Sequence, residues 1–212
     1  MAGKGSGFWN FMAPRYARSK ISDEATYQRK IDETRAILHD GMRVLEIGCG
    51  TGTTAVGHAP YVRSILGVDF SEKMIEIARA RAAEAGVENA RFEVGSASTL
   101  KAQPASFEAI LALNVLHLLP DYAQVIEKAY MMLPPGGYFV SSTACLGKGF
   151  TPVKLLLAVL APLGILPKVQ YISQDELLAA MRSAGFEVIS SWTPPAKMAA
   201  TFVIARRPSA AY

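Results

Sequence analysis

The chain has 212 residues, of which 50% are hydrophobic and 19% are charged, so it is long and apolar enough for one domain with a substantial core and is neither disordered nor fibrous. A net charge of +4 permits an anionic partner or membrane surface without requiring either. The two cysteines exclude a disulfide framework, and because no Cys/His cluster has metal-ligand spacing we expect no metal site.

The first residues, MAGKGSGFWN, lack the apolar core of a secretory signal. The most apolar stretch, residues 155–167, is interrupted by Pro162 and Gly164 and is too short to span a bilayer. We therefore expect a cytoplasmic protein, with peripheral contact to an anionic membrane as an open alternative.

Strand and helix signals alternate along the chain. In chain order we expect a helix over residues 23–39, strands over 44–47 and 65–68, a helix over 72–85, strands over 91–94 and 107–113, a helix over 121–133, a strand over 138–142, a helix over 173–185, and strands over 186–192 and 199–205. Ser22 and Ser71 are the expected N-caps of the first two helices, and Ser173 with Glu176 forms a capping box. The alternation predicts an α/β fold with a parallel sheet covered by helices on both faces.

The sequence VLEIGCGTGTTA, which includes the first expected strand, places three glycines within five positions after it. A glycine-rich turn between a strand and a helix lets a ligand approach the backbone closely. The spacing differs from the dinucleotide pattern G-x-G-x-x-G, because Thr53 takes the place of the last glycine, and from a P-loop, because no lysine follows Gly52. The pattern present, E-x-G-x-G-x-G from Glu46 to Gly52, resembles the first motif of class I S-adenosylmethionine (SAM)-dependent methyltransferases.

The resemblance extends over residues 40–205. GVDFSEKMIEIARAR looks like the family's second motif, FEAILALNVLHLL lies where its fourth strand reaches the active site, and LPPGGYFVSST resembles its turn into strand five. It implies a Rossmann-like, seven-stranded, mostly parallel sheet with an antiparallel last strand. It also implies SAM as the cofactor and S-adenosylhomocysteine as the product.

The resemblance also assigns roles to residues near the carboxyl ends of the strands. The glycines would admit the methionyl part of SAM, Glu46 would face its amino-acid end, and Asp69 would hold the ribose hydroxyls. Phe70 and Met74 would pack near the adenine. The alternative for Glu46 and Asp69 is that they only cap turns. The expected cofactor contacts are Tyr16, Glu46, Gly48, Cys49, Gly50, Gly52, Asp69, Phe70, Met74, Ser96, Ala97 and Asn114.

The adenine contact departs from the family pattern. The family often has an aspartate after strand three, where this chain reads VGSAS, so Ser96 or a backbone carbonyl would have to substitute.

His117, a few residues after the fourth expected strand, is the candidate catalytic base, because an acidic acceptor must lose a proton during methyl transfer. The alternative is that His117 caps or packs the following loop. Asn114 is expected to contact SAM through its backbone, and His39 and His58 are expected to have surface or capping roles. NVLH lacks the N/D-P-P-Y/F signature of enzymes that methylate nucleic-acid amino groups, so with the mild basicity we expect no nucleic-acid substrate.

Four parts are expected along the chain: an N-terminal helical lid over residues 1–40, a SAM-binding core over 41–143, an apolar helical insertion or cap over 144–172, and the C-terminal part of the core over 173–212. In the lid, Tyr16 and Lys20 are one helical turn apart and would share a face. The alternative for this segment is an apolar helix packed on the sheet edge.

The insertion is far longer than a usual connection and carries Lys148, Lys154 and Lys168 at or near its ends. An apolar cap flanked by lysines suits an apolar acceptor that bears phosphate or is drawn from a membrane surface. A helix pair packed on the domain, or a dimer contact, is the alternative.

The sequence therefore predicts a methyltransferase acting on a small apolar or lipid-like acceptor, with phospholipid amines or quinones as more specific alternatives. A SAM-binding module without catalysis and a nicotinamide-binding oxidoreductase are the alternatives from other classes, and the G-x-G-x-G spacing disfavours the oxidoreductase. The acceptor, its accepting atom and the oligomeric state stay open from the sequence alone.

Overall fold

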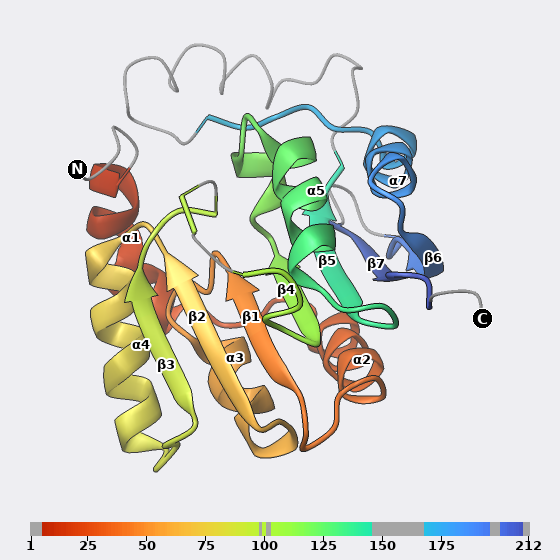
Figure 1. The fold of residues 1–212 in the computed structure, drawn as a ribbon. Helices are drawn as coiled ribbons and strands as arrows, with labels where there is room; N and C mark the ends of the chain where they lie inside the picture. The colour runs from red at the N-terminus through yellow and green to blue at the C-terminus, as the bar shows by residue number, and fades with distance from the viewer. Residues whose placement is uncertain (1–5, 98, 101–102, 146–167, 196–199, 210–212) are drawn as a thin grey trace.

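The computed structural model describes residues 6–97, 99–100, 103–145, 168–195 and 200–209. Their strands form a seven-stranded sheet in the order β3-β2-β1-β4-β5-β7-β6 (Figure 1). The strands are β1 (Arg43–Ile47), β2 (Ser64–Asp69), β3 (Ala90–Val94), β4 (Ala109–Leu113), β5 (Tyr138–Ala144), β6 (Glu187–Trp192) and β7 (Ala200–Arg206). Strands β1 to β5 pair in parallel, whereas β7 runs antiparallel to both β5 and β6. The predicted mostly parallel sheet with an antiparallel last strand is confirmed.

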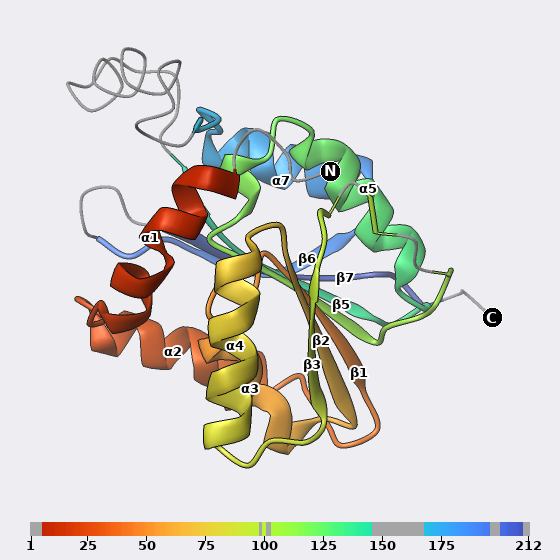
Figure 2. The same cartoon turned by 90° about the vertical axis from the view of Figure 1, so that its left-hand side faces the viewer.

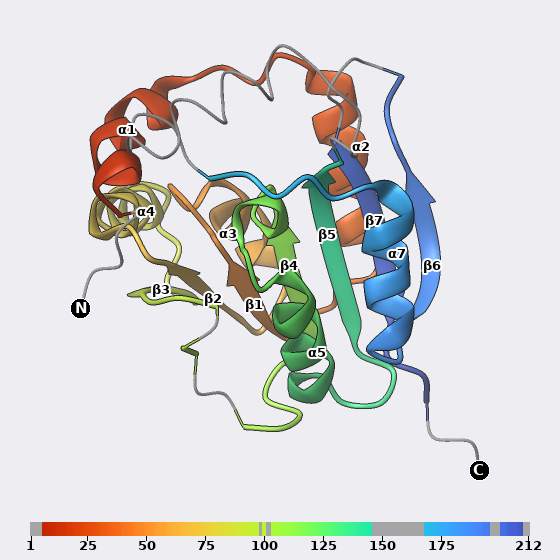
Figure 3. The same ribbon diagram turned by 90° about the horizontal axis from the view of Figure 1, so that it is seen from above.

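Helices cover both faces of this sheet. They are α1 (Ser6–Arg18), α2 (Glu24–Arg35), α3 (Thr53–His58), α4 (Glu72–Glu84), α5 (Tyr122–Met132) and α7 (Gln174–Ser183), with short 3-10 helices η1 (Ala59–Tyr61) and η2 (Leu116–Leu118). Figure 2 shows α2, α3 and α4 on one face and α5 and α7 on the other. Seen from above in Figure 3, α1 lies beside α4, and α2 lies at the end of the sheet that holds β7.

The unbroken apolar run of β4 follows from burial on both faces. Successive side chains of a strand point to opposite faces, so Ile110 and Ala112 join one core cluster while Ala109 and Leu111 join the other. All four are fully buried. A strand that feeds two cores has no solvent-facing positions, which is why its sequence does not alternate.

Two of the three predicted helix caps are confirmed. The Ser71 hydroxyl accepts the N–H of Met74 at 3.2 Å. At α7 the Ser173 hydroxyl accepts the N–H of Glu176, and the Glu176 carboxylate accepts the N–H of Ser173 at 2.9 Å, which is the reciprocal capping box.

The predicted boundaries of α2 are wrong at both ends. Asp23, and not Ser22, is the N-cap, because its carboxylate accepts the N–H of Thr26 at 3.0 Å. Both residue types cap well, and a carboxylate is additionally favoured at the positive end of the helix dipole. At the other end the helix stops at Arg35, four residues earlier than residue 39.

The predicted shared face of Tyr16 and Lys20 is also wrong. Helix α1 ends at Arg18, because the N–H and the hydroxyl of Ser19 both donate to the Tyr16 carbonyl, at 3.1 and 2.7 Å. Lys20 therefore lies beyond the helix, and only Tyr16 belongs to it.

His39 and His58 differ in environment. His39 is exposed, and its Nδ1 accepts the N–H of Gly41 at 3.2 Å, as a capping role predicts. His58 is fully buried, so a surface role for it is wrong. The Arg35 guanidinium of α2 donates to the carbonyl of the neighbouring Gly57 at 3.2 Å. Burial, with the Arg35 charge as a smaller cause, lowers the pKa of His58 to about 4.

The order of strands places a ligand-binding edge in the middle of the sheet. The chain passes from β1 outward to β2 and β3, and then returns to β4 on the other side of β1. Such a reversal leaves a crevice beyond the carboxyl ends of the strands concerned, which here end at Ile47, Asp69 and Leu113. No helix in the described ranges is both long and apolar enough to cross a membrane. The apolar run of residues 155–167 lies outside those ranges.

Candidate active site

The glycine-rich loop is held against the neighbouring strand. The backbone N–H groups of Gly48 and Cys49 both donate to the Val68 carbonyl, with N···O distances of 2.8 and 3.1 Å. The N–H of Gly50 donates to Oδ2 of Asp69 at 3.0 Å. These bonds lock the loop to the carboxyl end of β2, so that the loop lines the crevice.

The glycines of the loop are required for different reasons. Gly50 has φ +52°, and a Cβ built there would meet only the ring of Tyr16, at 3.8 Å, so its missing side chain leaves cavity space. Gly52 has φ +74°, but its Cβ would lie 2.8 Å from Cβ of Ala78 and 3.0 Å from the ring of Phe92. The missing side chain of Gly52 therefore allows the loop to pack closely against α4 and β3. Gly52 does not line the cavity.

Asp69 presents a carboxylate at the end of β2. Its Oδ1 accepts the N–H of Ser71 at 2.9 Å and its Oδ2 accepts that of Gly50. Burial raises the pKa of Asp69, while its backbone hydrogen bonds oppose that shift. An ionised carboxylate has about four acceptor positions, so Asp69 can cap this turn and still accept hydrogen bonds from a ligand diol.

Glu46 is the most perturbed acid of the site. It is 3% exposed, and its Oε2 has no hydrogen-bond partner among the described residues. Burial raises the pKa of Glu46 to about 8; the nearby Asp69 carboxylate adds to the shift, and a hydrogen bond from the Ala55 backbone opposes it. A buried carboxyl oxygen without a partner is unfavourable, so a cation placed beside Glu46 would be strongly stabilised.

Two adjoining cavities occupy the crevice. The larger has a volume of about 400 Å³ and the smaller, next to Glu46, about 70 Å³. Five residues line both cavities: Tyr16, Gly48, Gly50, Leu113 and Asn114. The two cavities therefore adjoin, and the smaller one is lined by the acidic Glu46.

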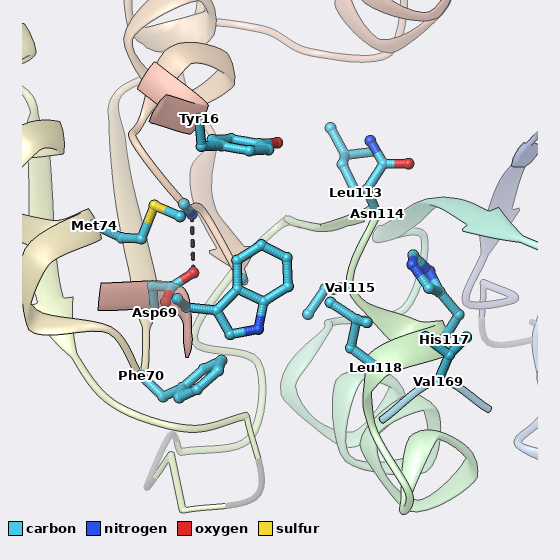
Figure 4. A pocket seen from close by; sticks show the side chains of 13 residues that line it. Tyr16, Asp69, Phe70, Met74, Leu113, Asn114, Val115, His117, Leu118 and Val169 are labelled. Carbon is cyan, nitrogen blue, oxygen red and sulfur yellow. Dashed lines mark hydrogen bonds between the residues drawn. The ribbon is translucent and has the colours of Figure 1, made fainter. Parts of the chain in front are cut away.

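The larger cavity has two unlike walls (Figure 4). One wall carries Tyr16, Asp69, Phe70 and Met74. Trp9 of α1 also lines the cavity. The opposite wall is mostly apolar and consists of Leu113, Asn114, Val115, His117, Leu118 and Val169. The first wall combines a carboxylate with flat and flexible apolar groups, which suits a nucleoside, and the second leaves room for another molecule.

His117 belongs to the apolar wall. It is half-buried, its Nδ1 has no hydrogen-bond partner among the described residues, and burial lowers its pKa. Its backbone carbonyl accepts the N–H of Gln170 at 2.7 Å, which holds the preceding Val169 at the cavity. The backbone of His117 thus supports the loop while its imidazole remains neutral and able to accept a proton at neutral pH.

Most of the predicted cofactor contacts line one of the two cavities: Tyr16, Glu46, Gly48, Cys49, Gly50, Asp69, Phe70, Met74 and Asn114. Gly52, Ser96 and Ala97 line neither. Ala97 is packed in the core, and its carbonyl oxygen accepts a hydrogen bond from Nζ of Lys128 at 3.3 Å.

Several lining residues were not among the predicted contacts. Trp9 could have been found, because it stands on the same predicted aromatic helix as Tyr16. The side chains of Leu118 and Val169 had no recognisable signal, since apolar residues of these types occur throughout the chain.

The site fits the cofactor that the sequence motifs imply. SAM carries an ammonium, a sulfonium and a ribose diol. The orphaned oxygen of Glu46 matches a cation, Asp69 matches the diol, and the space left by Gly50 admits a chain between them. The acidic residues would suit a pyrophosphate poorly, because like charges repel in a buried site.

Comparison with known proteins agrees with this geometry. Residues 38–192 match a family model described as a methyltransferase domain. A ubiquinone biosynthesis O-methyltransferase of Paracidovorax citrulli is 32% identical over 161 residues, which are 71% of this chain and 66% of that protein. The chain thus spans about two thirds of the length of this relative.

Solved structures share the fold. The YcgJ protein of Bacillus subtilis superposes with a TM-score of 0.70 at 20% identity, covering 87% of this chain and all of that one. The cyclase SpnF superposes with a TM-score of 0.74 at 19% identity, covering 91% of this chain and 84% of that one. Because a protein described as a cyclase has this fold too, the fold alone does not identify a reaction.

Proposed function

The chain belongs to the class I S-adenosylmethionine-dependent methyltransferases, and we propose that it transfers a methyl group from SAM to a hydroxyl oxygen of a small apolar acceptor. When bound, SAM supplies a methyl group activated by a positively charged sulfonium. The motif spacing and the family match both favour this reading over a nicotinamide-binding oxidoreductase.

An apolar acceptor is supported by the wall opposite Asp69. Leu113, Val115, Leu118 and Val169 contribute hydrocarbon there, and His117 is the one titratable side chain among the described residues of that wall. A mostly apolar pocket with one polar group orients a ligand that carries one polar atom on an apolar body. A phenol or hydroquinone has this character.

The observation that carries the proposal is the imidazole of His117, whose pKa burial lowers, in this apolar wall. A hydroxyl oxygen attacks a methyl group far better after it loses its proton, whereas a neutral amine needs no such loss before attack. Neutral His117 would accept the hydroxyl proton, and the surrounding side chains would exclude water from the reacting atoms. Trp9 and Tyr16 of α1 line the same cavity.

Quinone-type acceptors are the more specific form of this proposal. The relatives named as ubiquinone biosynthesis O-methyltransferases support them, because the chain is about 30% identical to several of these proteins. A SAM-binding protein without methyl transfer remains the alternative from another class, and turnover separates the two.

Peripheral contact with an anionic membrane would bring an apolar acceptor to the site. Support comes from the outer face of α1, where Phe11 is 83% exposed and Arg15 and Arg18, one and two turns further along, are exposed as well. An exposed aromatic ring beside two cations suits the boundary between anionic headgroups and acyl chains.

The test is an acceptor panel in which each alkyl-substituted phenol or hydroquinone is paired with the same ring bearing an amino group. Mass spectrometry should find the methyl group on oxygen. The His117→Gln variant should lower kcat by about 10²–10⁴-fold while binding S-adenosylhomocysteine like the parent. The matched control is His39→Gln, which alters an exposed histidine. Methylation of the amines alone, or a loss below tenfold in His117→Gln, would contradict the proposal.

A further inference from the structure

The acidic residue Glu46 lines the small cavity. No lysine or arginine is found among the described residues that line it. The amino-acid end of SAM carries a carboxylate as well as an ammonium, and in the small cavity that carboxylate would lie near Glu46. Two like charges in a poorly solvated site repel strongly, so the carboxylate needs a positive partner from outside the first layer of residues.

Lys30 of α2 is placed to supply it. It is half-buried, and its Nζ donates to the hydroxyl of Ser142 at 2.9 Å. Its ammonium lies 6.0 Å from the ring centroid of Trp192, within reach of a cation–π interaction. None of the ion pairs found among the described residues includes Lys30. Burial lowers the pKa of Lys30, and the Asp23 carboxylate at the N-cap of α2 opposes that shift. Because Asp23 does not form an ion pair with Lys30, the charge of Lys30 can still act on a neighbouring anion.

A hydrogen-bonded chain leads from Lys30 to the cavity. Lysine can only donate, so Ser142 Oγ accepts from it and directs its own proton to Oδ1 of Asn114, at 3.4 Å. The Asn114 side-chain oxygen thus accepts from Ser142, and its NH₂ group is left to donate elsewhere. Figure 4 shows this amide beside the cavity, between Tyr16 and His117.

The backbone of Asn114 is held in place as well. Its φ is +57°, a left-handed conformation that non-glycine residues seldom adopt and that asparagine tolerates. Its N–H donates to the Ser142 carbonyl at 2.7 Å. Asn114 is therefore fixed to Ser142 through both backbone and side chain, and it lines both cavities.

We propose that Lys30 is a positioning residue for the cofactor: through Ser142 it orients the Asn114 amide to donate to the cofactor carboxylate, and its charge offsets that of the carboxylate. The inference rests on the proposed use of SAM. An anionic oxygen of the acceptor has the same chemistry, so the experiment has to separate the two sources.

The experiment compares S-adenosylhomocysteine with its decarboxylated analogue, which keeps the amino group, by calorimetry without any acceptor. The parent should prefer the carboxylate-bearing ligand. Lys30→Met should weaken that ligand about tenfold or more and leave the analogue within about twofold. Ser142→Ala, which keeps the lysine, should give a smaller loss with the same selectivity, and Lys30→Arg should recover part of the affinity. Arg29→Met, which removes a charge from the same helix but away from Ser142, should bind like the parent.

Equal binding of S-adenosylhomocysteine by Lys30→Met and the parent would overturn the inference and assign Lys30 to the acceptor or to the fold. An equal loss for both ligands would overturn it too. Where Lys30→Met does not fold, the same criteria apply to Ser142→Ala. A parent protein that binds neither ligand would refute the proposed function itself. That result differs from one in which the parent and Lys30→Met both bind S-adenosylhomocysteine with the same affinity, which would refute only the role of Lys30.

Discussion

Glu46 should release a proton when the cofactor binds. With a pKa of about 8, roughly 0.9 of Glu46 is protonated at pH 7 in the free protein. The ligand ammonium favours the ionised form, so binding should release about 0.9 protons at pH 7, and affinity should rise about eightfold from pH 6.5 to 7.5. Calorimetric titration of S-adenosylhomocysteine in phosphate and in Tris separates the proton release from the binding enthalpy.

The Glu46→Gln variant is the control for this proton release. It should bind the ligand more weakly, release no proton and lose the pH dependence. A parent protein whose binding enthalpy is the same in both buffers at pH 7 would show that Glu46 is already ionised, and the argument from its burial would fail.

Glu46 should also make the stability of the free protein depend on pH, and in the opposite direction from ligand affinity: stability should fall as the pH rises. The folded state keeps the proton of Glu46 up to pH 8, whereas the unfolded chain loses it near pH 4.5. The stabilising contribution is therefore present below about pH 4.5 and is lost as the pH rises to about 8, by up to about 1.4 kcal/mol per pH unit. Glu46→Gln should thus gain in unfolding free energy relative to the parent between pH 5 and 8. Parallel curves for the two proteins in chemical denaturation would contradict this.

Three further predictions concern the glycine loop, His117 and the exposed face of α1. Gly50→Val should abolish S-adenosylhomocysteine binding and lower the melting temperature only modestly. Gly52→Val should mainly lower the melting temperature, because the Cβ at this position would meet protein atoms at 2.8 Å. The same pattern for both variants in calorimetry and thermal melts would refute this distinction. Because burial lowers the pKa of His117, the acidic fall of kcat/KM should lie below about pH 6.5, and a midpoint above that value would exclude His117 as the base. In sedimentation with vesicles that contain anionic lipid, Phe11→Ser should reduce binding of the protein. Met131→Ser, which alters a 57% exposed residue on α5, is the control and should not reduce it. Equal binding by the parent and Phe11→Ser would show that α1 does not contact the membrane.

The architecture could be predicted from the sequence because its signals are local. Buried parallel strands are continuous apolar runs, and the run at Ala109–Leu113 could be identified without knowing its neighbours. Caps such as Ser71 act within one helical turn. The distance along the chain from the pattern Glu46–Gly52 to Asp69 is set by helix α3, the short helix η1 and strand β2. The spacing of the motif residues therefore already indicates the fold.

Other features were decided by contacts that no local pattern encodes. His58 has an ordinary sequence environment, and only the tertiary packing buries it. The glycines of the loop look equivalent in sequence, yet Gly50 faces the cavity while Gly52 faces Ala78, because the direction of a Cβ depends on the turn geometry and on which helix packs against it.

The residues that complete the site are separated furthest along the chain. Lys30 and Ser142 are 112 positions apart, and their hydrogen bond exists only because α2 packs near the carboxyl end of β5. Val169 likewise reaches the cavity through the bond between Gln170 and the carbonyl of His117. The sequence by itself determined the strands, the loop and the two acidic residues, since each depends on neighbours along the chain. The tertiary structure alone decided which groups share the cavity with them, because that depends on how distant segments pack.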